Sequence, residues 1–221
     1  MNYMLIGALM LLNASACLTV PASPAPPAHA IFDSVDFKDV LRWTPSANSS
    51  DVRYDVQWKI YGVAEWLDVA KCQGIREPSC DLSGVTSNPR EWYYARVRAS
   101  SPPQSSKWVL SPRFSPRLDT KISAPQLGLN VSEQGIVVHV PTLQALTRKL
   151  QSSRLHNTLI YNIYLLNQAG QEEVFKLRCC SGSLLVSKVK HKTKYCFQSQ
   201  SVLQMLGRDS ARGPAKCITT L

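Results

Sequence analysis

The four histidines and a group of early aspartates are the residues of this 221-residue chain that could perform acid–base or metal chemistry. The histidines form no HExxH spacing, and the chain contains neither a GxSxG nucleophile turn nor a glycine-rich phosphate loop. Asp33, Asp36 and Asp39 cluster near the first predicted strand without a facing carboxylate, which favours a solvated edge. The sequence therefore predicts no enzyme, no cofactor and no metal site.

The stretch from Trp92 to Phe114, WYYARVRASSPPQSSKWVLSPRF, interleaves arginines with aromatic rings, as single-stranded nucleic-acid sites do. In a strand, Tyr94, Arg96 and Arg98 share one face, and small or apolar residues share the other. After the SSPPQSS turn, Trp108 begins a return strand, where each arginine stacked on it contributes roughly 0.5–2 kcal/mol. We interpret Arg96, Arg98 and Trp108 as a structural cation–π ladder and expect no nucleic-acid partner.

A second basic feature is the run Lys188–Lys194, which carries four lysines at alternate positions. On a strand, all four would point from one face. Such a row is either a solvated edge that resists aggregation or a site for an anionic glycan. The second half of the chain is strongly basic, since residues 121–221 hold 13 Lys and Arg against 4 Asp and Glu, a net +9 of the formal +10.

The first residues have the pattern of a secretory signal. An apolar run, Met4–Leu12, precedes a small-residue cleavage pattern that ends at Ala16, with cleavage as late as residue 30 as the alternative. Residues 17–30 then form a disordered, Pro-rich leader. No later apolar run approaches the roughly 18 residues of a membrane span. We expect a secreted, extracellular protein, in which Asn48 and Asn130 begin glycosylation sequons.

Six cysteines remain if cleavage falls beyond Cys17, and in an oxidising compartment they are disulfide candidates rather than metal ligands. Cys72 and Cys80 bracket a seven-residue loop, a feasible short disulfide. Cys196 and Cys217 lie at the start and end of the last predicted hairpin and could close it. The adjacent cysteines at positions 179 and 180 are cramped for a mutual bond, and their pairing stays open.

Alternating patterns dominate the chain. Tyr54, Val56 and Trp58 share one strand face, and the segments Ile136–Val140 and Leu159–Leu165 are rich in β-branched and aromatic residues. Prolines punctuate these segments as they do in sandwich turns. The sequence therefore predicts an all-β chain of antiparallel sandwiches with about 100 residues each.

Two such sandwiches fit the length. The strand pattern breaks at residues 115–125, so we place domain 1 at residues 31–118 and domain 2 at residues 119–221. Residues 142–155 give the best local support for a helical bundle, the weaker alternative. We interpret them as a long, partly irregular connection between two strands.

The chain resembles the class II cytokine receptor family. Ser106–Ser111 is a degenerate form of the Trp-Ser motif of cytokine receptors, and Ser34–Phe37, Leu41–Pro45 and the two outer cysteine pairs suggest the class II branch. The segments KIYGVAEW, PSCDLSGVTS, YYARVRAS, SPRFSP and DTKI also follow in the family's order. The resemblance implies two tandem fibronectin type III (immunoglobulin-like) domains.

The resemblance also implies a function. It points to a secreted soluble decoy receptor that binds interleukin-22, a helical cytokine of the interleukin-10 family, and blocks its engagement of the membrane signalling receptor. The alternatives are the ectodomain of a membrane class II receptor, a tissue-factor-like cofactor and a heparin-binding secreted module. In this family, cytokine contacts lie in loops at the elbow between the domains. Carried over, the implied contacts are Tyr61, Gly62, Thr86, Ser87, Trp108, Val109, Asp119, Thr120, Leu203 and Gly207.

Overall fold

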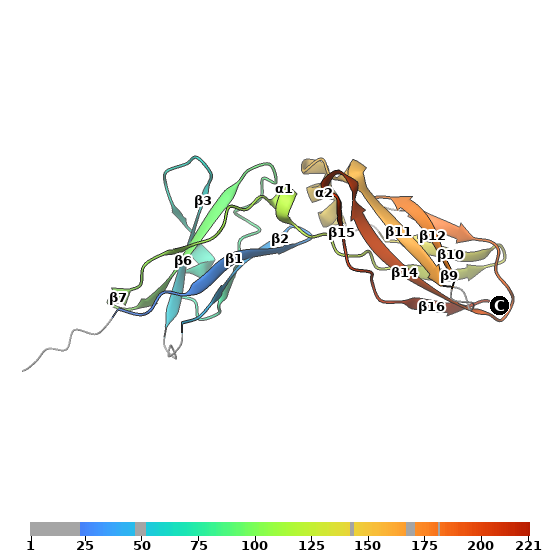
Figure 1. The fold of residues 1–221 in the computed structure, drawn as a ribbon, viewed down its shortest axis with the longest axis horizontal. Coiled ribbons are helices and arrows are strands. Elements are labelled where there is room, and N and C mark those ends of the chain that lie inside the picture. The colour runs from blue at the N-terminus through green and yellow to red at the C-terminus, as the bar shows by residue number, and fades with distance from the viewer. Residues whose placement is uncertain (1–22, 47–51, 142–143, 167–170, 181) are drawn as a thin grey trace, which may run out of the picture.

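The structure is a computed structural model that describes residues 23–46, 52–141, 144–166, 171–180 and 182–221. Over these residues the chain forms two β-sandwiches that meet at an elbow (Figure 1). The all-β prediction is confirmed. The signal-like run and Asn48 lie outside the described residues.

Domain 1 consists of a three-stranded sheet that faces a five-stranded sheet. The first sheet has the order β1 (Ala28–Val35), β2 (Lys38–Thr44), β5 (Ser79–Asp81). The second has the order β4 (Leu67–Asp68), β3 (Arg53–Ile60), β6 (Tyr93–Ser101), β7 (Gln104–Ser105), with β8 (Val109–Leu110) also paired to β6. A short 3₁₀ helix, η1 (Ala70–Cys72), follows β4.

The strand period decides which side of domain 1 becomes core. Along β6 every second residue is buried, and Ala95 and Val97 meet Tyr54 and Val56 of β3 inside the domain. The intervening arginines face outward, as the sequence predicted. The predicted disulfide Cys72–Cys80 is confirmed and closes the same core.

Domain 2 repeats this plan. Its three-stranded sheet has the order β9 (Gly128–Ser132), β10 (Gly135–Val140), β13 (Gly182–Val186). Its five-stranded sheet has the order β12 (Glu172–Arg178), β11 (Leu159–Leu166), β14 (Lys194–Leu203), β15 (Arg208–Asp209), with β16 (Lys216–Thr219) also paired to β14. The short helices are α1 (Pro116–Asp119) before the domain and α2 (Gln144–Ser152), η2 (His156–Thr158) and η3 (Gln204–Leu206) within it.

The connection from β10 to β11 is more regular than predicted. It contains the helix α2, and Leu150 and Leu155 are fully buried in the domain 2 core. An amphipathic helix over the sandwich opening satisfies its own backbone while burying one apolar face, which an irregular loop would not do.

The cysteines of domain 2 form two disulfides. The predicted bond between Cys196 and Cys217 joins β14 to β16 and is confirmed. Cys179 and Cys180, whose pairing the sequence left open, are bonded to each other after β12.

The predicted disordered leader is wrong for its last residues. Ala28 already begins β1, Ala30 belongs to the domain 1 core, and Pro27 is buried. The Ser23 hydroxyl donates to the carbonyl of Ser105 at 2.7 Å. Small residues and proline pack closely along a sheet edge, so composition alone did not separate this stretch from a flexible leader.

The elbow is built by the tip of the β1–β2 hairpin of domain 1 (Figure 1). Asp36 and Phe37 adopt positive φ at this tip, and the Phe37 side chain enters the domain 2 core. The Asp36 backbone N–H donates to the carbonyl of Lys121 at 2.8 Å, and its carboxylate accepts from the Ser123 hydroxyl at 2.6 Å. The hairpin therefore ties the two sandwiches together through both polar and apolar contacts.

Candidate binding surface at the elbow

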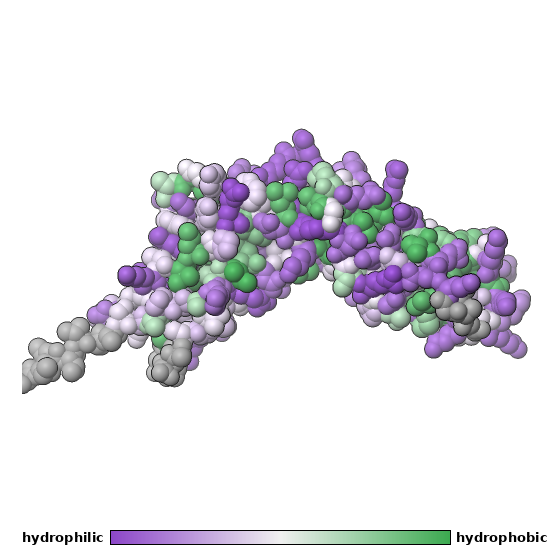
Figure 2. Space-filling model, in the orientation of Figure 1, coloured by the Kyte–Doolittle hydropathy of each residue, from purple (hydrophilic) through white to green (hydrophobic). Residues whose placement is uncertain are grey.

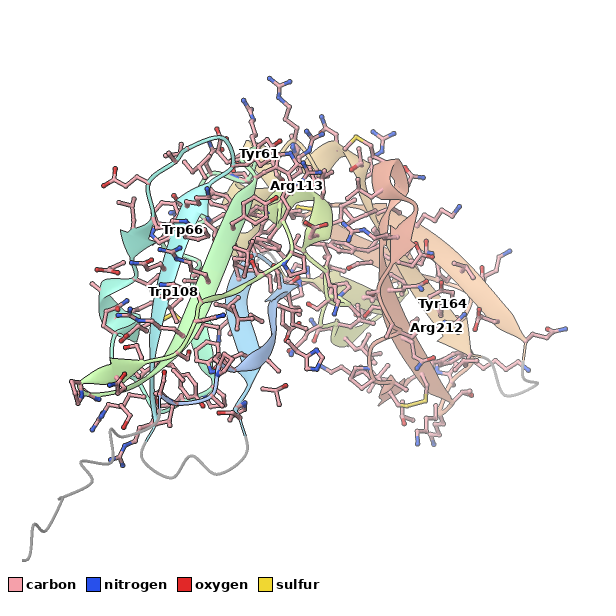
Figure 3. The ribbon with its side chains drawn as sticks, turned by 60° about the vertical axis from the view of Figure 1, so that its left-hand side comes forward. Tyr61, Trp66, Trp108, Arg113, Tyr164 and Arg212 are labelled. Atoms are coloured by element: carbon pink, nitrogen blue, oxygen red, sulfur yellow. A yellow bond between two sulfur atoms is a disulfide. The ribbon has the colours of Figure 1, made fainter. Side chains whose placement is uncertain are left out.

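The outer face of the five-stranded sheet of domain 1 carries the predicted cation–π ladder. The Arg96 and Arg98 guanidiniums lie 4.5 and 4.7 Å from the Trp108 ring centroid, which confirms the predicted stacking. The ladder continues beyond it, since Arg96 also stacks on Trp66 at 4.2 Å and Lys59 lies 5.0 Å from the same ring. Figure 3 shows Trp66 and Trp108 one above the other along the strands.

Strand β3 supplies hydrogen-bond acceptors to both arginines. Arg96 donates to the Gln57 side-chain oxygen at 2.8 Å through Nε, and Arg98 donates to the Asp55 carboxylate at 3.1 Å. Burial under the rings, and then the nearby charge of Arg98, lowers the pKa of Arg96. Each arginine is thus fixed by a ring and an acceptor, so the ladder holds β3 and β6 in register.

The loop after β3 places Tyr61 at the surface. Its side chain is 56% exposed, which rejects the alternative that Tyr61 is a core residue. The Tyr61 N–H donates to the carbonyl of Trp92 at 2.7 Å. Arg113 stacks on Trp92 at 4.0 Å and lies 5.5 Å from the Tyr61 ring (Figure 3). Gly62 has φ +86° and open space around its missing side chain, so a partner could approach the backbone there.

The surface continues from the loop before β6 into domain 2. The Ser87 carbonyl accepts from Lys149 Nζ of α2 at 3.3 Å, and the Pro89 carbonyl accepts from the Arg117 N–H at 3.2 Å. The Arg117 guanidinium in turn lies 4.0 Å from the Met205 sulfur of η3. These contacts connect the Tyr61 loop, α1, α2 and η3 into one continuous surface.

Three of the residues implied as contacts are buried instead. Thr86 is 1% exposed, Thr120 0% and Leu203 3%. Their side chains cannot meet a partner in this conformation, and we correct the prediction for them. Loop position in the sequence did not reveal that their side chains turn inward.

Two of these buried side chains belong to a polar network around Asp39. The Asp39 carboxylate accepts from the hydroxyls of Ser34 and Thr86, and the Ser34 hydroxyl oxygen accepts from the Thr120 hydroxyl at 2.9 Å. Thr120 accepts the Phe37 N–H at 3.0 Å. Burial raises the pKa of the Asp39 carboxyl, and the bonds from Ser34 and Thr86 partly offset this. Asp39 is therefore a buried brace of the elbow and not the solvated residue that the sequence favoured.

The other implied contacts fall into two groups. Asp119 and Gly207 are exposed on the elbow surface, where Asp119 accepts the Ser115 N–H at 2.7 Å and Gly207 ends η3 with φ +59°. Trp108 and Val109 are half-buried, and Figure 3 shows Trp108 further along the sheet, away from Tyr61. The structure thus brings together Tyr61, Gly62, Ser87, Asp119 and Gly207, and it leaves Trp108 and Val109 apart.

The elbow surface mixes apolar and basic side chains. Its loops expose Tyr61, Val63, Leu118 and Met205, and Figure 2 shows apolar and polar groups side by side across the elbow. Arg113 adds a guanidinium against the rings. An exposed ring fixed by a stacked guanidinium is the type of anchor that protein interfaces use. Among the described residues, no cluster of three or more His, Cys, Asp or Glu side chains could hold a metal ion.

Sequence reasoning missed Arg113 and Lys149. Arg113 precedes Phe114, which pairs with Tyr93 across an isolated bridge. In the antiparallel register of this bridge, Arg113 lies opposite Tyr94, on the strand face that Tyr94 shares with Trp92. The contact between Lys149 and Ser87 joins residues 62 positions apart, and no local pattern announces it.

The lysine run differs from its predicted form. Residues 187–193 connect β13 to β14 as a turn, and only Lys194 lies on a strand. The alternating lysines therefore do not form a row on one strand face. Lys192 has φ +48°, and the side chain of Thr220 closes the turn by accepting the Thr193 N–H at 3.0 Å.

The sequon residue Asn130 is exposed on β9, opposite Val137 of β10. Its side chain is open to the addition of a glycan, and its modification stays a prediction.

Two antiparallel sandwiches in tandem form a two-domain architecture of the fibronectin type III class. A chicken interferon gamma receptor alpha chain has this fold, with a TM-score of 0.71 and 23% identity over 90% of this chain and 98% of its own. The family model described as tissue factor matches residues 3–108, and the model described as interferon-alpha/beta receptor, fibronectin type III, matches residues 120–221.

Individual relatives agree. Human interleukin-20 receptor subunit alpha is 31% identical over 88% of this chain, although the chain spans only 36% of that protein's length. Mouse interleukin-22 receptor subunit alpha-2 is 27% identical over 98% of this chain and 97% of its own length. The chain belongs to the class II cytokine receptor family, whose fold is not enzymatic.

No helix among the described residues has the length and apolar character needed to cross a membrane.

Proposed function

We propose that the chain is a secreted soluble receptor that binds interleukin-22 at the elbow and keeps it from its membrane signalling receptor. The observation that carries this proposal is the similarity to interleukin-22 receptor subunit alpha-2 along almost the whole of both chains, in mouse and also in rat at 27% identity. The exposed Tyr61 loop at the elbow supports it with a surface suited to a protein partner.

In this account the ring of Tyr61 is the anchor. Its N–H bond to Trp92 and its contact with Arg113 limit its motion, so little side-chain entropy is lost when it is covered. Gly62, Ser87, Asp119 and the η3 turn around Gly207 complete the rim. Trp108 and Val109 act indirectly, by keeping the sheet behind the Tyr61 loop rigid.

Inhibition would follow from occupancy alone. A receptor that covers the surface used by the signalling receptor competes for the cytokine by mass action. Slow dissociation then matters more than fast encounter, since affinity differences between related complexes lie mainly in the dissociation rate.

The direct test is capture of interleukin-10-family cytokines by the full chain, expressed in mammalian cells and recovered from the medium. We expect interleukin-22 to be retained most strongly, and added chain to lower interleukin-22 signalling in responsive cells. Retention of a different family member with no binding of interleukin-22, or binding without loss of signalling, would contradict the proposal.

The similarity to interleukin-20 receptor subunit alpha favours a second candidate, the ectodomain of a membrane receptor subunit. The same cytokine panel separates the soluble receptor from the membrane receptor ectodomain, because the ectodomain predicts binding of interleukin-20 instead of interleukin-22. Recovery of the native protein from the membrane fraction of its own cells would also favour it.

A further inference from the structure

The turn that carries the lysine run lies at the end of domain 2 away from the elbow (Figure 1). Strand β14 runs from Lys194 at this end to Leu203, which lines a cavity at the elbow together with Val35 and Thr120. Ten strand residues at about 3.3 Å each separate the two ends by roughly 30 Å. A ligand at the turn would therefore leave the elbow surface free.

The backbone of the turn is fixed by side chains from neighbouring strands. The Lys190 N–H donates to the Tyr195 hydroxyl at 2.9 Å, and the Thr193 N–H donates to the Thr220 hydroxyl at 3.0 Å. The Thr220 hydroxyl in turn donates to the Lys190 carbonyl. Because the backbone is held, the ammonium groups are presented at a limited set of positions, which reduces the entropy lost on binding.

The turn concentrates positive charge without compensation. Lys188, Lys190, Lys192 and Lys194 are all exposed, as is His191. None of them takes part in an ion pair between described residues. Domain 2 offers few acids to balance them, since only 4 Asp and Glu stand against 13 Lys and Arg over residues 121–221. An unbalanced field of this kind attracts polyanions.

The neighbouring side chains select among polyanions. Tyr195 packs against the domain 2 core and its hydroxyl accepts the Lys190 N–H, so the turn presents no free Phe, Tyr or Trp ring for stacking on nucleic-acid bases. Val189 packs against the domain 2 core, and the exposed Leu221, whose carbonyl accepts the Lys192 N–H, adds a single apolar side chain beside the turn, which is far less than an apolar face that enters a lipid surface. Recognition rests on closely spaced charge alone, which suits the repeated sulfates of an extracellular polysaccharide.

We propose that the 187–193 turn and Lys194 bind a sulfated glycosaminoglycan chain. The site is independent of the proposed cytokine surface, and bound glycan would hold the protein in the extracellular matrix with its elbow still open.

The test measures binding of the full chain to immobilised heparin and to desulfated heparin over a range of salt concentrations. The test variant replaces the four lysines Lys188, Lys190, Lys192 and Lys194 with glutamine. The control variant makes the same charge change at four exposed sites elsewhere, Lys71, Arg76, Lys107 and Lys176. Thermal unfolding of both variants checks that the fold is kept.

We expect binding that depends on sulfation and that weakens at least about tenfold in the test variant, as four surface charge contacts together imply. The control variant should lose far less affinity for heparin. Equal losses in both variants would show attraction by net charge alone and overturn the proposal. Binding to single-stranded DNA or to phosphatidylserine vesicles as tight as to heparin would overturn it too. If the fourfold variant unfolds, the single variants Lys190→Gln and Lys192→Gln replace it. Each must then lose more affinity for heparin than a single control variant such as Lys71→Gln.

Discussion

The two five-stranded sheets have the same topology, but their outer faces carry different side-chain contacts. In domain 1, Arg96 and Arg98 alternate with Trp66 and Trp108 in a ladder that crosses several strands. In domain 2, the corresponding face carries one stack, with Arg212 3.7 Å from the Tyr164 ring centroid (Figure 3). A paired carboxylate, Glu172, holds that arginine at 2.7 Å.

The difference shows which domain must be rigid. The ladder lies on β3 and β6, the strands that lead into the Tyr61 loop, and Arg113 forms a separate stack with Trp92 and Tyr61 at that loop. Domain 2 contributes to the elbow through α2 and η3, which are short helices fixed by their own contacts. Its sheet therefore needs less bracing, and the basic turn at its far end is left free for another ligand.

The largest effect we expect comes from removing the loop-closing disulfide of each domain, Cys72–Cys80 or Cys196–Cys217. The bond Cys196–Cys217 closes a longer loop than Cys72–Cys80, with sequence separations of 21 and 8. Chain-entropy arguments give about 3 kcal/mol for either bond, with the larger loss for the longer loop. Serine pairs at each site, measured by calorimetric unfolding, test this. A larger loss at Cys72–Cys80 would mean that domain 1 depends on its disulfide more than loop length implies.

A smaller loss should follow from cutting the ladder. Arg96→Ala removes two stacks and the hydrogen bonds to Gln57, and we expect about 2 kcal/mol in urea unfolding. Arg212→Ala, the matched change in domain 2, should cost less because Arg212 is exposed and stacks on one ring. Arg96→Lys should recover only part of the loss, since lysine lacks the planar group. Equal costs for Arg96 and Arg212 would remove the contrast between the two sheets.

The smallest effect concerns pH at the elbow. Because burial raises the folded-state pKa of Asp39, its ionised form opposes folding, and protonation relieves this. Lowering the pH from about 7 towards about 4 should therefore stabilise the wild type relative to Asp39→Asn. Urea unfolding of both proteins at several pH values measures the difference. If the wild type instead loses stability relative to Asp39→Asn as the pH falls, the hydrogen bonds from Ser34 and Thr86 lower the pKa of Asp39 by more than burial raises it.

Features that follow from the alternation of residues along one strand could be predicted from the sequence. The outward arginines of β6 and their stacking on Trp108 follow from alternation and one hairpin, so local pattern was sufficient. The cysteine pairs were readable because each brackets one loop or one hairpin.

Features that depend on distant residues could not be predicted in the same way. The inward turn of Thr86 depends on Asp39 of β2, and that of Thr120 depends on Ser34 of β1. The lysine run has the alternation of a strand but forms a turn. Thr220, which directly follows β16, closes this turn by accepting the Thr193 N–H. In both cases a contact between segments far apart in sequence decided the conformation, overriding the local pattern.

The most direct measurement is the affinity of interleukin-22 for Tyr61→Ala by surface plasmon resonance. We predict a loss of more than about 2 kcal/mol, since an exposed, preorganised ring has the features of a hot spot. The matched control, Leu110→Ala, removes an equally exposed apolar side chain from β8 and should bind normally. Unchanged binding by a folded Tyr61→Ala protein, or equal losses in both variants, would contradict the elbow as the cytokine site.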